Sequence, residues 1–212
     1  MSSNEHIVYV VDDDFRVREG LNELLASAGF EVVTFRTAGE YLAYKRPDLP
    51  ACLVLDVGLP DINGLDLQRQ IAGEPHPRIV FITGHGDIPS SVQACKAGAV
   101  DFLTKPFSDV QLLGAIRTAI AQDRDDRLKR ARLAELQRRL SVLTPREKEV
   151  LPLVVSGLLN KQAAAELAIS EVTLQIHRGK IMQKMEAGSL AELVRMADAL
   201  GVPANYARRP RR

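Results

Sequence analysis

Short apolar runs alternate with helix-like segments through the first half of this chain of 212 residues. Continuous apolar runs rich in β-branched residues are typical of strands that are buried on both faces. Five such runs cover residues 7–11, 32–35, 52–57, 79–83 and 100–103. Between them, apolar residues recur at helical spacing, most clearly from Val17 to Ala28, and Gly29 closes that segment. The repeated order of strand and helix predicts an α/β doubly wound fold, a parallel sheet with helices on both sides.

A long charged segment without turn residues follows the fifth run. From Asp109 to about Leu143 there is no proline and, apart from Gly114, no glycine, so we expect one long helix. Leucines near its end follow 3-4-3 spacing, which fits either the seam of a short coiled-coil dimer or a solvated linker. They are Leu133, Leu136, Leu140 and Leu143. The pattern leaves both interpretations open.

The remainder of the chain predicts an all-α domain of four helices. Thr144, Pro145 and Glu147 form a capping-box signature with proline at the first helical position. The helices are expected at residues 145–156, 161–167, 171–185 and 190–200. Ser170 is a fitting N-cap for the third of them. Two short helices joined by the tight turn 168–169 predict a helix-turn-helix, whose second helix enters the major groove of DNA.

Charge separates the two halves of the chain, although the formal net charge of the whole is only +1. Residues 1–122 carry 10 Lys or Arg and 16 Asp or Glu, whereas residues 123–212 carry 18 and 11. The basic half is a plausible nucleic-acid partner because neutralising phosphates releases condensed counterions. We expect an α/β domain at 1–123, a helical linker at 124–143, a helix-turn-helix domain at 144–206 and a basic tail at 207–212.

The cysteines and the N-terminal residues indicate where in the cell the protein is expected. Cys52 and Cys95 form neither a metal-binding pair nor a disulfide framework, which fits a reducing environment. The first residues lack the basic start and apolar run of a signal peptide, and no stretch is long enough to span a bilayer. We therefore expect a soluble, cytoplasmic protein without a membrane partner.

Chemically active side chains follow the predicted strands at their carboxyl ends. Asp12 and Asp13 end the first strand, Asp56 the third and Thr83 the fourth, and Lys105 follows the fifth. In a parallel sheet all of them converge on one edge, where the functional crevice of such folds lies. Crowded carboxylates repel one another, and a site made only of oxygen ligands suits Mg²⁺. Singly, each residue is better explained as a turn, a cap or a solvated side chain, so the prediction depends on their joint placement.

The segments VYVVDDD, LVLDVGLPDINGL, IVFITGHGD and AVDFLTKPF resemble the receiver domain of two-component response regulators. The resemblance implies a five-stranded sheet of order 2-1-3-4-5, with Asp56 as the phosphoacceptor. Magnesium would be held by Asp13, Asp56 and the carbonyl of Gly58, with Asp12 acting largely through water. Thr83 and Phe102 would be the switch pair, Lys105 would offset charge on the phosphoryl group, and Lys105-Pro106 would be a cis peptide.

The segment from Leu143 to Met185 resembles the LuxR-type helix-turn-helix, and the whole chain resembles the LuxR/FixJ-like response regulators. Leu174, His177, Ile181 and Met185 are expected to face the core. The candidate DNA contacts are Lys161, Thr173, Gln175, Ile176, Arg178, Gly179, Lys180 and Lys184. Departures from the family pattern are Pro152, which should kink the first helix, and Gly179, which costs the recognition helix about 1 kcal/mol relative to alanine.

These inferences predict a DNA-binding transcriptional regulator that a sensor histidine kinase switches by phosphorylating Asp56. The expected partners are that kinase, promoter DNA and a second copy of the chain on phosphorylation or DNA binding, with RNA polymerase as a further candidate. The protein is expected to be no enzyme beyond accepting, and in time releasing, its own phosphoryl group. The alternatives are a constitutive DNA-binding dimer with a structural receiver and a magnesium-dependent phosphohydrolase. The latter is disfavoured because Val57 and Gly58 follow Asp56, so the Asp-x-Asp pair of aspartate phosphatases is absent.

Overall fold

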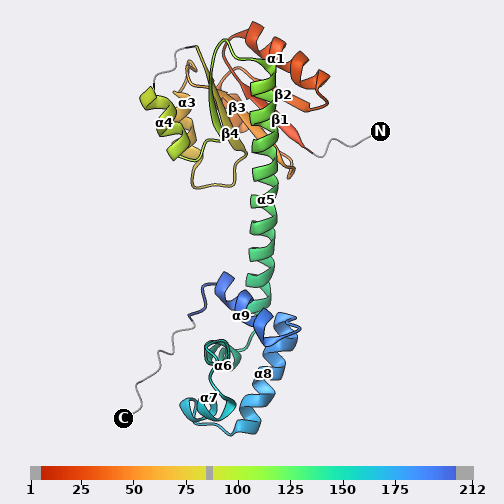
Figure 1. Cartoon of the computed structure of the whole chain (residues 1–212), viewed down its shortest axis with the longest axis vertical. Helices are drawn as coiled ribbons and strands as arrows, with labels where there is room; N and C mark the ends of the chain where they lie inside the picture. Colours follow the sequence, from red (N-terminus) through yellow and green to blue (C-terminus); the bar gives the residue numbers. More distant parts are fainter. Residues whose placement is uncertain (1–5, 85–87, 204–212) are drawn as a thin grey trace. The chain divides into compact units, whose positions relative to one another are not determined.

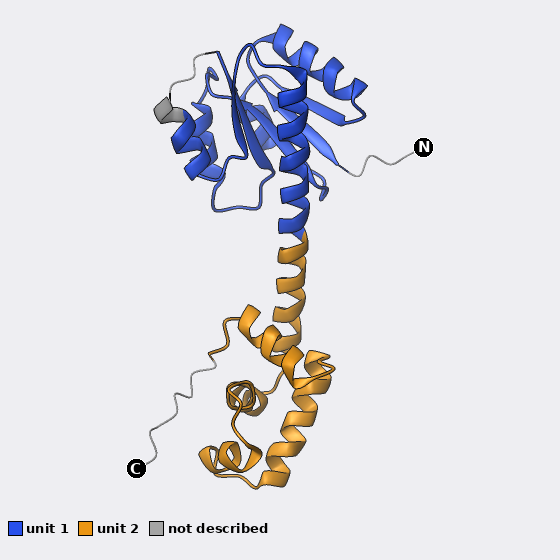
Figure 2. Cartoon of the chain, viewed as in Figure 1, with its two compact units in different colours: residues 1–127 blue, residues 128–212 orange. Residues whose placement is uncertain are grey.

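The computed structural model describes residues 6–84 and 88–203. The chain divides into two compact units, residues 1–127 and 128–212 (Figure 2). Each unit has its own apolar core. The predicted basic tail, 207–212, lies outside the described residues. Among the described helices, none is long and apolar enough to cross a membrane.

Unit 1 is built on a five-stranded parallel sheet (Figure 1). Its strands are β1 Ile7–Val11, β2 Glu31–Phe35, β3 Ala51–Asp56, β4 Arg78–Thr83 and β5 Asp101–Thr104. The order β2-β1-β3-β4-β5 confirms the predicted doubly wound topology. All residues of β1 and β3 are buried, as continuous apolar runs predict. The edge strand β2 differs, because only Phe35 of its five residues is buried.

Helices cover both faces of this sheet. They are α1 Phe15–Ser27, α2 Ala38–Ala43, α3 Gly64–Ile71, α4 Ile88–Lys96 and α5 Asp109–Ser141. Alternate residues of β1 point to opposite faces, so Tyr9 packs with α2, α3 and α4, whereas Val8 and Val10 pack with α1 and the first part of α5. The sheet is therefore shielded on both sides, and only its edges remain open to solvent.

Helix α5 is tied to the sheet by a buried carboxylate that the sequence pattern did not single out. Asp123 is 1% exposed, and its Oδ2 accepts a hydrogen bond of 2.9 Å from the backbone N–H of Ala51. The same oxygen accepts one of 2.6 Å from Nε of Arg127. Because Ala51 begins β3, this side chain fixes α5 against the amino end of the central strand.

Unit 2 contains the four predicted helices. They are α6 Pro145–Val155, α7 Asn160–Glu166, α8 Glu171–Met185 and α9 Leu190–Ala199. The predicted capping box is present, with both Thr144–Glu147 hydrogen bonds formed, and Ser170 caps α8. Pro152 lies inside α6, and the helix nevertheless continues through it to Val155.

The leucine repeat, which runs from the end of α5 to Leu143 just beyond it, has a role that neither interpretation of the sequence included. Leu136 and Leu143 are 5% and 3% exposed, and they belong to the apolar core of unit 2, with Leu140 packed against it. Leu133, at 38%, stays exposed. The spacing of these leucines thus places an apolar stripe of α5 against the neighbouring helices of the same chain.

Replacing Asp123 with alanine is expected to lower the free energy of unfolding of unit 1 by about 2–4 kcal/mol, since it leaves the N–H of Ala51 and Nε of Arg127 without their acceptor. Asp125→Ala, at an exposed position on the same helix, is the matched control and should change it by less than about 0.5 kcal/mol. Urea unfolding followed by tyrosine fluorescence measures this, because Tyr9, Tyr41 and Tyr44 lie in unit 1. Equal stabilities of the two variants would show that the hydrogen bonds of Asp123 do not hold α5 against β3.

Candidate functional site

The side chains predicted at the strand ends meet in one crevice at the carboxyl edge of the sheet. Asp12 follows β1 and is fully buried, and Asp56 ends β3 at 7% exposure, whereas Asp13 is exposed. Carboxylate oxygens of these three residues all lie within 4.8 Å of one another. With Thr83 and Lys105 they line a cavity of about 410 Å³. The topology therefore brings together residues that are far apart along the chain.

Hydrogen bonds fix the deepest carboxylate of the crevice. One carboxylate oxygen of Asp12 accepts a hydrogen bond of 2.9 Å from the N–H of Asp14, and the other accepts one of 2.6 Å from Nζ of Lys105. The backbone carbonyl of Asp12 accepts a hydrogen bond of 2.7 Å from Nη1 of Arg18. Nζ of Lys105 also lies 3.6 Å from Oδ2 of Asp56. One ammonium is thus shared by two carboxylates, and the third carboxylate leaves an excess of negative charge.

Asp56 is held in an environment that disfavours its charge. Burial raises the pKa of its carboxyl above the usual range, the Lys105 ammonium opposes this shift, and Asp12 adds to it. A hydrogen bond from the N–H of Gly58 also works to lower the pKa. A cation placed among the three carboxylates would relieve this repulsion, and their oxygen donors suit a hard divalent ion such as Mg²⁺.

Of the other residues that the resemblance singled out, Thr83 lines this crevice and Phe102 lies on the neighbouring strand β5. Thr83 ends β4 and is 4% exposed. Phe102, on β5, is half-buried against the core, with its ring centroid 6.0 Å from that of Phe81. The Lys105–Pro106 peptide bond is cis, as the resemblance implied.

Gly64 is a site residue that the sequence analysis missed. It begins α3, and its N–H donates a hydrogen bond of 2.9 Å to the carbonyl of Val57. A Cβ at this position would lie 2.4 Å from the backbone oxygen of Asp56 and 3.1 Å from Cα of Val57. The only sequence signal is the Asn63-Gly64 pair after the strand. Glycine is required here because α3 approaches the backbone that carries Asp56.

Asp61 is a second residue that was missed. Its carboxylate accepts hydrogen bonds from the backbone N–H groups of Ala38 (3.3 Å) and Gly39 (2.9 Å). Partial burial works to raise the pKa of Asp61, but these hydrogen bonds outweigh it and lower the pKa. The loop after Asp56 is thereby fastened to the first turn of α2.

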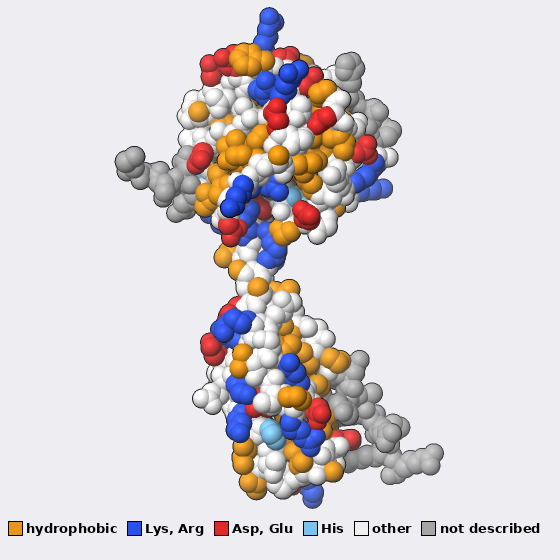
Figure 3. Space-filling model, turned by 180° about the vertical axis from the view of Figure 1, so that it is seen from behind, with side chains coloured by type: hydrophobic (Ala, Val, Ile, Leu, Met, Phe, Trp, Pro, Cys, Tyr) orange, Lys and Arg blue, Asp and Glu red, His pale blue; other side chains and the backbone are white. Residues whose placement is uncertain are grey.

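The candidate DNA interface is the exposed side of α8, together with α7. Leu174, Ile181 and Met185 are fully buried, as predicted, and His177 is half-buried. The predicted contacts that are exposed are Lys161, Gln175, Ile176, Gly179 and Lys180. In Figure 3, Lys and Arg side chains (blue) recur along the face of unit 2 that is shown. This surface combines cationic, amide and aliphatic groups.

Three of the predicted contacts also have partners inside unit 2. Lys184 donates a hydrogen bond of 2.7 Å to Oε2 of Glu147, which is 2% exposed. Burial works to raise the pKa of Glu147, but its hydrogen bonds with Lys184 and Thr144 outweigh it and lower the pKa. Arg178 donates a hydrogen bond of 3.1 Å to Oδ1 of Asn160, and Oγ1 of Thr173 lies 2.8 Å from Oγ of Ser170. These groups have structural roles as well as candidate binding roles.

Two exposed aliphatic residues on this side were not predicted. Val172 is 68% exposed and Leu159 is 69% exposed, beside Ile176 at 54%. Val172 and Ile176 are four residues apart on α8, so they share a face of the helix. The available signal for Val172 was its spacing of four residues from Ile176, the one aliphatic residue among the predicted contacts.

Both units match known families. Residues 8–117 match the model of the response regulator receiver domain, and residues 141–197 match that of the bacterial regulatory proteins of the luxR family. Nodulation protein W of Bradyrhizobium diazoefficiens is 50% identical over 206 residues, covering 97% of this chain and 91% of that protein. The transcriptional regulatory protein FixJ of the same species is 42% identical over 204 residues, covering 95% of this chain and 98% of that protein.

Solved structures agree with these matches. The response regulator StyR is 48% identical, with a TM-score of 0.80, and the match covers 92% of this chain and 98% of that one. Full-length FixJ from B. japonicum is 40% identical, with a TM-score of 0.54, covering 94% and 98%. Each comparison extends over both units.

Gly64→Ala is expected to lower the free energy of unfolding of unit 1 by about 1–3 kcal/mol, because the new methyl group overlaps a backbone that cannot move freely. Gly114→Ala is the matched control: it is exposed inside α5, with no atom within 4 Å of its ideal Cβ. That control should raise stability by about 0.5–1 kcal/mol. Tyrosine-monitored urea unfolding compares them. Equal changes in the two variants would contradict the steric constraint at Gly64.

Proposed function

The chain belongs to the LuxR/FixJ-like family of two-component response regulators, transcriptional regulators that join a receiver domain to a LuxR-type DNA-binding domain, and we propose that phosphorylation of Asp56 by a sensor histidine kinase switches its binding to promoter DNA. The observation that carries the proposal is the convergence of Asp12, Asp13, Asp56 and Lys105 at one edge of the sheet.

Asp56 is the proposed nucleophile. One of its carboxylate oxygens attacks the phosphorus of a phosphohistidine on the kinase, the bond from phosphorus to the imidazole nitrogen breaks, and an acyl phosphate forms. Lys105 supports this role, since its ammonium already lies 3.6 Å from Oδ2 of Asp56 and can offset charge on the phosphoryl oxygens. Slow hydrolysis of the acyl phosphate would return the protein to its initial state.

Magnesium is the proposed cofactor of this step. Asp13, Asp56 and the backbone carbonyl of Gly58 would hold it, with Asp12 contributing largely through water. The fit is supported by three carboxylates whose oxygens lie within 4.8 Å of one another, of which only Asp12 and Asp56 pair with the Lys105 ammonium among the described residues. When bound, the ion offsets negative charge on the carboxylates and on the phosphoryl group.

Thr83 and Phe102 are the proposed switch. Thr83 lies at the end of β4 in the same cavity as Asp56, so its hydroxyl can move towards a phosphoryl oxygen. The ring of Phe102, half-buried beside Phe81, would turn inward into the vacated space. The altered surface would then favour homodimerisation and binding of promoter DNA, with RNA polymerase as a further partner.

Helix α8 is the proposed recognition helix. Gln175 can read adenine, Ile176 can contact a thymine methyl group, and Lys161, Thr173, Arg178 and Lys180 can hold phosphates. Gly179 permits close approach to the DNA backbone. Lys184 differs from the others because its ammonium is bonded to the buried Glu147, so its first role is to stabilise unit 2.

Asp56→Asn is expected to abolish activation without unfolding the protein. Sedimentation with Mg²⁺, with and without acetyl phosphate, should show donor-driven dimerisation and tighter binding to promoter-library DNA in the wild type only. Asp125→Asn, at an exposed position, is the matched control and should respond like the wild type. If Asp56→Asn and the wild type behave alike, the receiver is structural and DNA binding is constitutive. Steady hydrolysis of a phosphomonoester that requires Asp56 would instead indicate a phosphohydrolase.

Lys180→Gln and Lys184→Gln are expected to have separate effects. Lys180 is exposed, so its loss should weaken binding to every duplex and reduce the slope of log affinity against log salt by about 0.9. Lys184→Gln leaves Glu147 without its ammonium and should lower the free energy of unfolding of unit 2 by about 1–3 kcal/mol, with little change in that slope. Binding to duplexes selected from a random library, at several salt concentrations, and thermal unfolding measure the two effects. An unchanged salt slope in the Lys180→Gln variant would show that Lys180 does not contact the DNA.

A further inference from the structure

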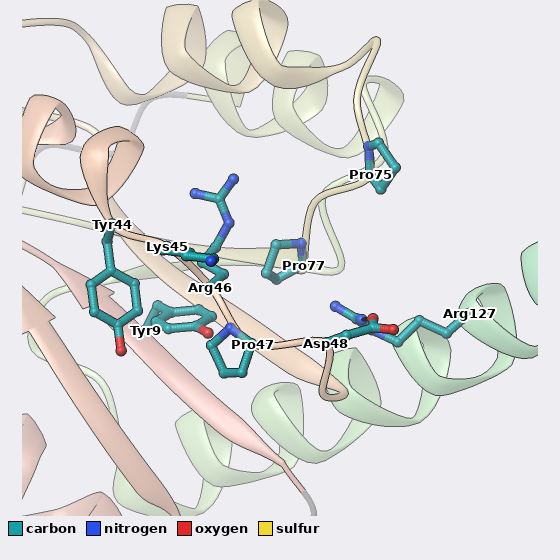
Figure 4. A pocket seen from close by; sticks show the side chains of 9 residues that line it. All are labelled: Tyr9, Tyr44, Lys45, Arg46, Pro47, Asp48, Pro75, Pro77 and Arg127. Atoms are coloured by element: carbon teal, nitrogen blue, oxygen red, sulfur yellow. Dashed lines mark hydrogen bonds and ion pairs between the residues drawn. The ribbon is translucent and has the colours of Figure 1, made fainter.

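A second cavity, of about 340 Å³, lies in unit 1 (Figure 4). Its walls come from Tyr9 of β1, the loop that leads into β3, the loop before β4 and Arg127 of α5. The two loops precede their strands, so the cavity lies towards the amino edge of the sheet, away from the carboxylates at the carboxyl edge. Its volume is within the range of pockets for small ligands, about 300–1,000 Å³.

Positive charge predominates among the side chains that line this cavity. They include Lys45, Arg46 and Arg127, against one carboxylate, Asp48. Arg127 is positioned by the buried Asp123 at 2.6 Å and forms an ion pair with Asp48. The Asp48 side chain is 98% exposed, and exposed ion pairs contribute little stability, so an incoming anion can displace it.

The other two cations are available in different ways. Arg46 is positioned, because its Nη1 donates a hydrogen bond of 3.2 Å to the carbonyl of Tyr41 and its guanidinium lies 4.8 Å from the centroid of the Tyr41 ring. Lys45 is exposed and has no hydrogen bond or ion pair with any residue that the structure describes. The cavity therefore offers two oriented guanidiniums and one ammonium that can follow a ligand.

A buried hydroxyl lacks a partner at the same place. Tyr9 is 1% exposed, and its hydroxyl has no hydrogen-bond partner among the described residues. Burial raises the pKa of Tyr9 to about 12, Tyr44 adds to the shift, and Arg46 and Arg127 oppose it. The hydroxyl therefore stays protonated and can donate. Figure 4 shows it directed towards Pro47, among the side chains that line the cavity.

The walls of the cavity are stiff. Pro47, Pro75 and Pro77 line it, and the proline ring fixes one backbone dihedral at each position. A site with restrained walls loses little conformational freedom on binding, which favours affinity for a small ligand.

We propose that this cavity binds a small molecule that carries a carboxylate or phosphate group. One ligand oxygen accepts a hydrogen bond from the hydroxyl of Tyr9, and the negative charge is shared by Lys45, Arg46 and Arg127. The site is separate from the phosphoacceptor crevice, so its occupancy does not depend on Asp56.

The test is an NMR titration of the ¹⁵N-labelled full chain in the Asp56→Asn variant without Mg²⁺, which excludes acyl phosphate formation and metal-bound phosphate at the acidic crevice. Sodium phosphate and sodium acetate are added in separate arms, against sodium chloride at the same ionic strength. The expected result is saturable shifts centred on the amides of residues 45–48 and on Tyr9 and Arg127, in the phosphate arm, the acetate arm or both. The comparison of arms identifies the preferred group.

Tyr9→Phe removes only the hydroxyl and is expected to weaken binding about tenfold, because a hydrogen bond to a charged acceptor is lost. Lys45→Gln changes an exposed side chain, so it should keep the fold while also weakening binding. Lys96→Gln, at an exposed position on α4, is the matched control and should bind like its parent. The proposal is overturned if neither anion gives saturable shifts, if Tyr9→Phe and Lys45→Gln bind like the parent, or if Lys96→Gln weakens binding equally.

Discussion

The parallel arrangement of the five strands is the constraint on which the receiver chemistry depends. Parallel strands all end at one edge, so residues separated by more than 90 positions along the chain, such as Asp12 and Lys105, become neighbours at 2.6 Å. The return connections are helices that cover both faces of the sheet, which leaves the edges as the places where polar groups can face solvent. Repulsion among the three carboxylates is the cost of this convergence. The Lys105 ammonium offsets it only in part, and the remaining negative charge is why the crevice is suited to a divalent cation.

Buried charged groups with few partners maintain the position of the helices in both units. In unit 1, Asp123 joins α5 to the start of β3. In unit 2, Glu147 accepts hydrogen bonds from the backbone at the start of α6 and from Lys184 of α8. Apolar packing alone would tolerate a rotation or a small slide of either helix, whereas a buried carboxylate with fixed donors does not. These contacts therefore specify the helix positions more narrowly than burial of leucines does.

Periodicity and strand-end chemistry predicted most of the fold and the outline of the acidic crevice, because both depend on residue type at regular spacing. The parallel doubly wound sheet, the capping box at Thr144 and the buried face of α8 follow from such local patterns, whereas the strand order was implied by the resemblance to receiver domains. Contacts between distant segments could not be predicted in this way. Gly64 is required by a close approach to Asp56, and the partner of Asp123 is a backbone N–H 72 positions away. The leucine repeat at the end of α5 could not be interpreted fully for the same reason, because heptad-like spacing predicts an apolar stripe but not the surface that packs against it.

The direction of the βα units also explains why the two edges of the receiver sheet differ in charge. Each helix begins near the carboxyl edge, where its free N–H groups favour negative charge, and the end of α2 lies towards the amino edge, where free carbonyl groups favour positive charge. Asp14 caps α1, and α3 begins beside Asp56. At the other edge, Arg46 follows α2 and donates to the carbonyl of Tyr41 in its last turn. Carboxylates thus gather where strands end and helices start, and cations gather where α2 ends. An acidic crevice at one edge of a small sheet and a cavity lined mainly by cations at the other are therefore consequences of the same chain direction.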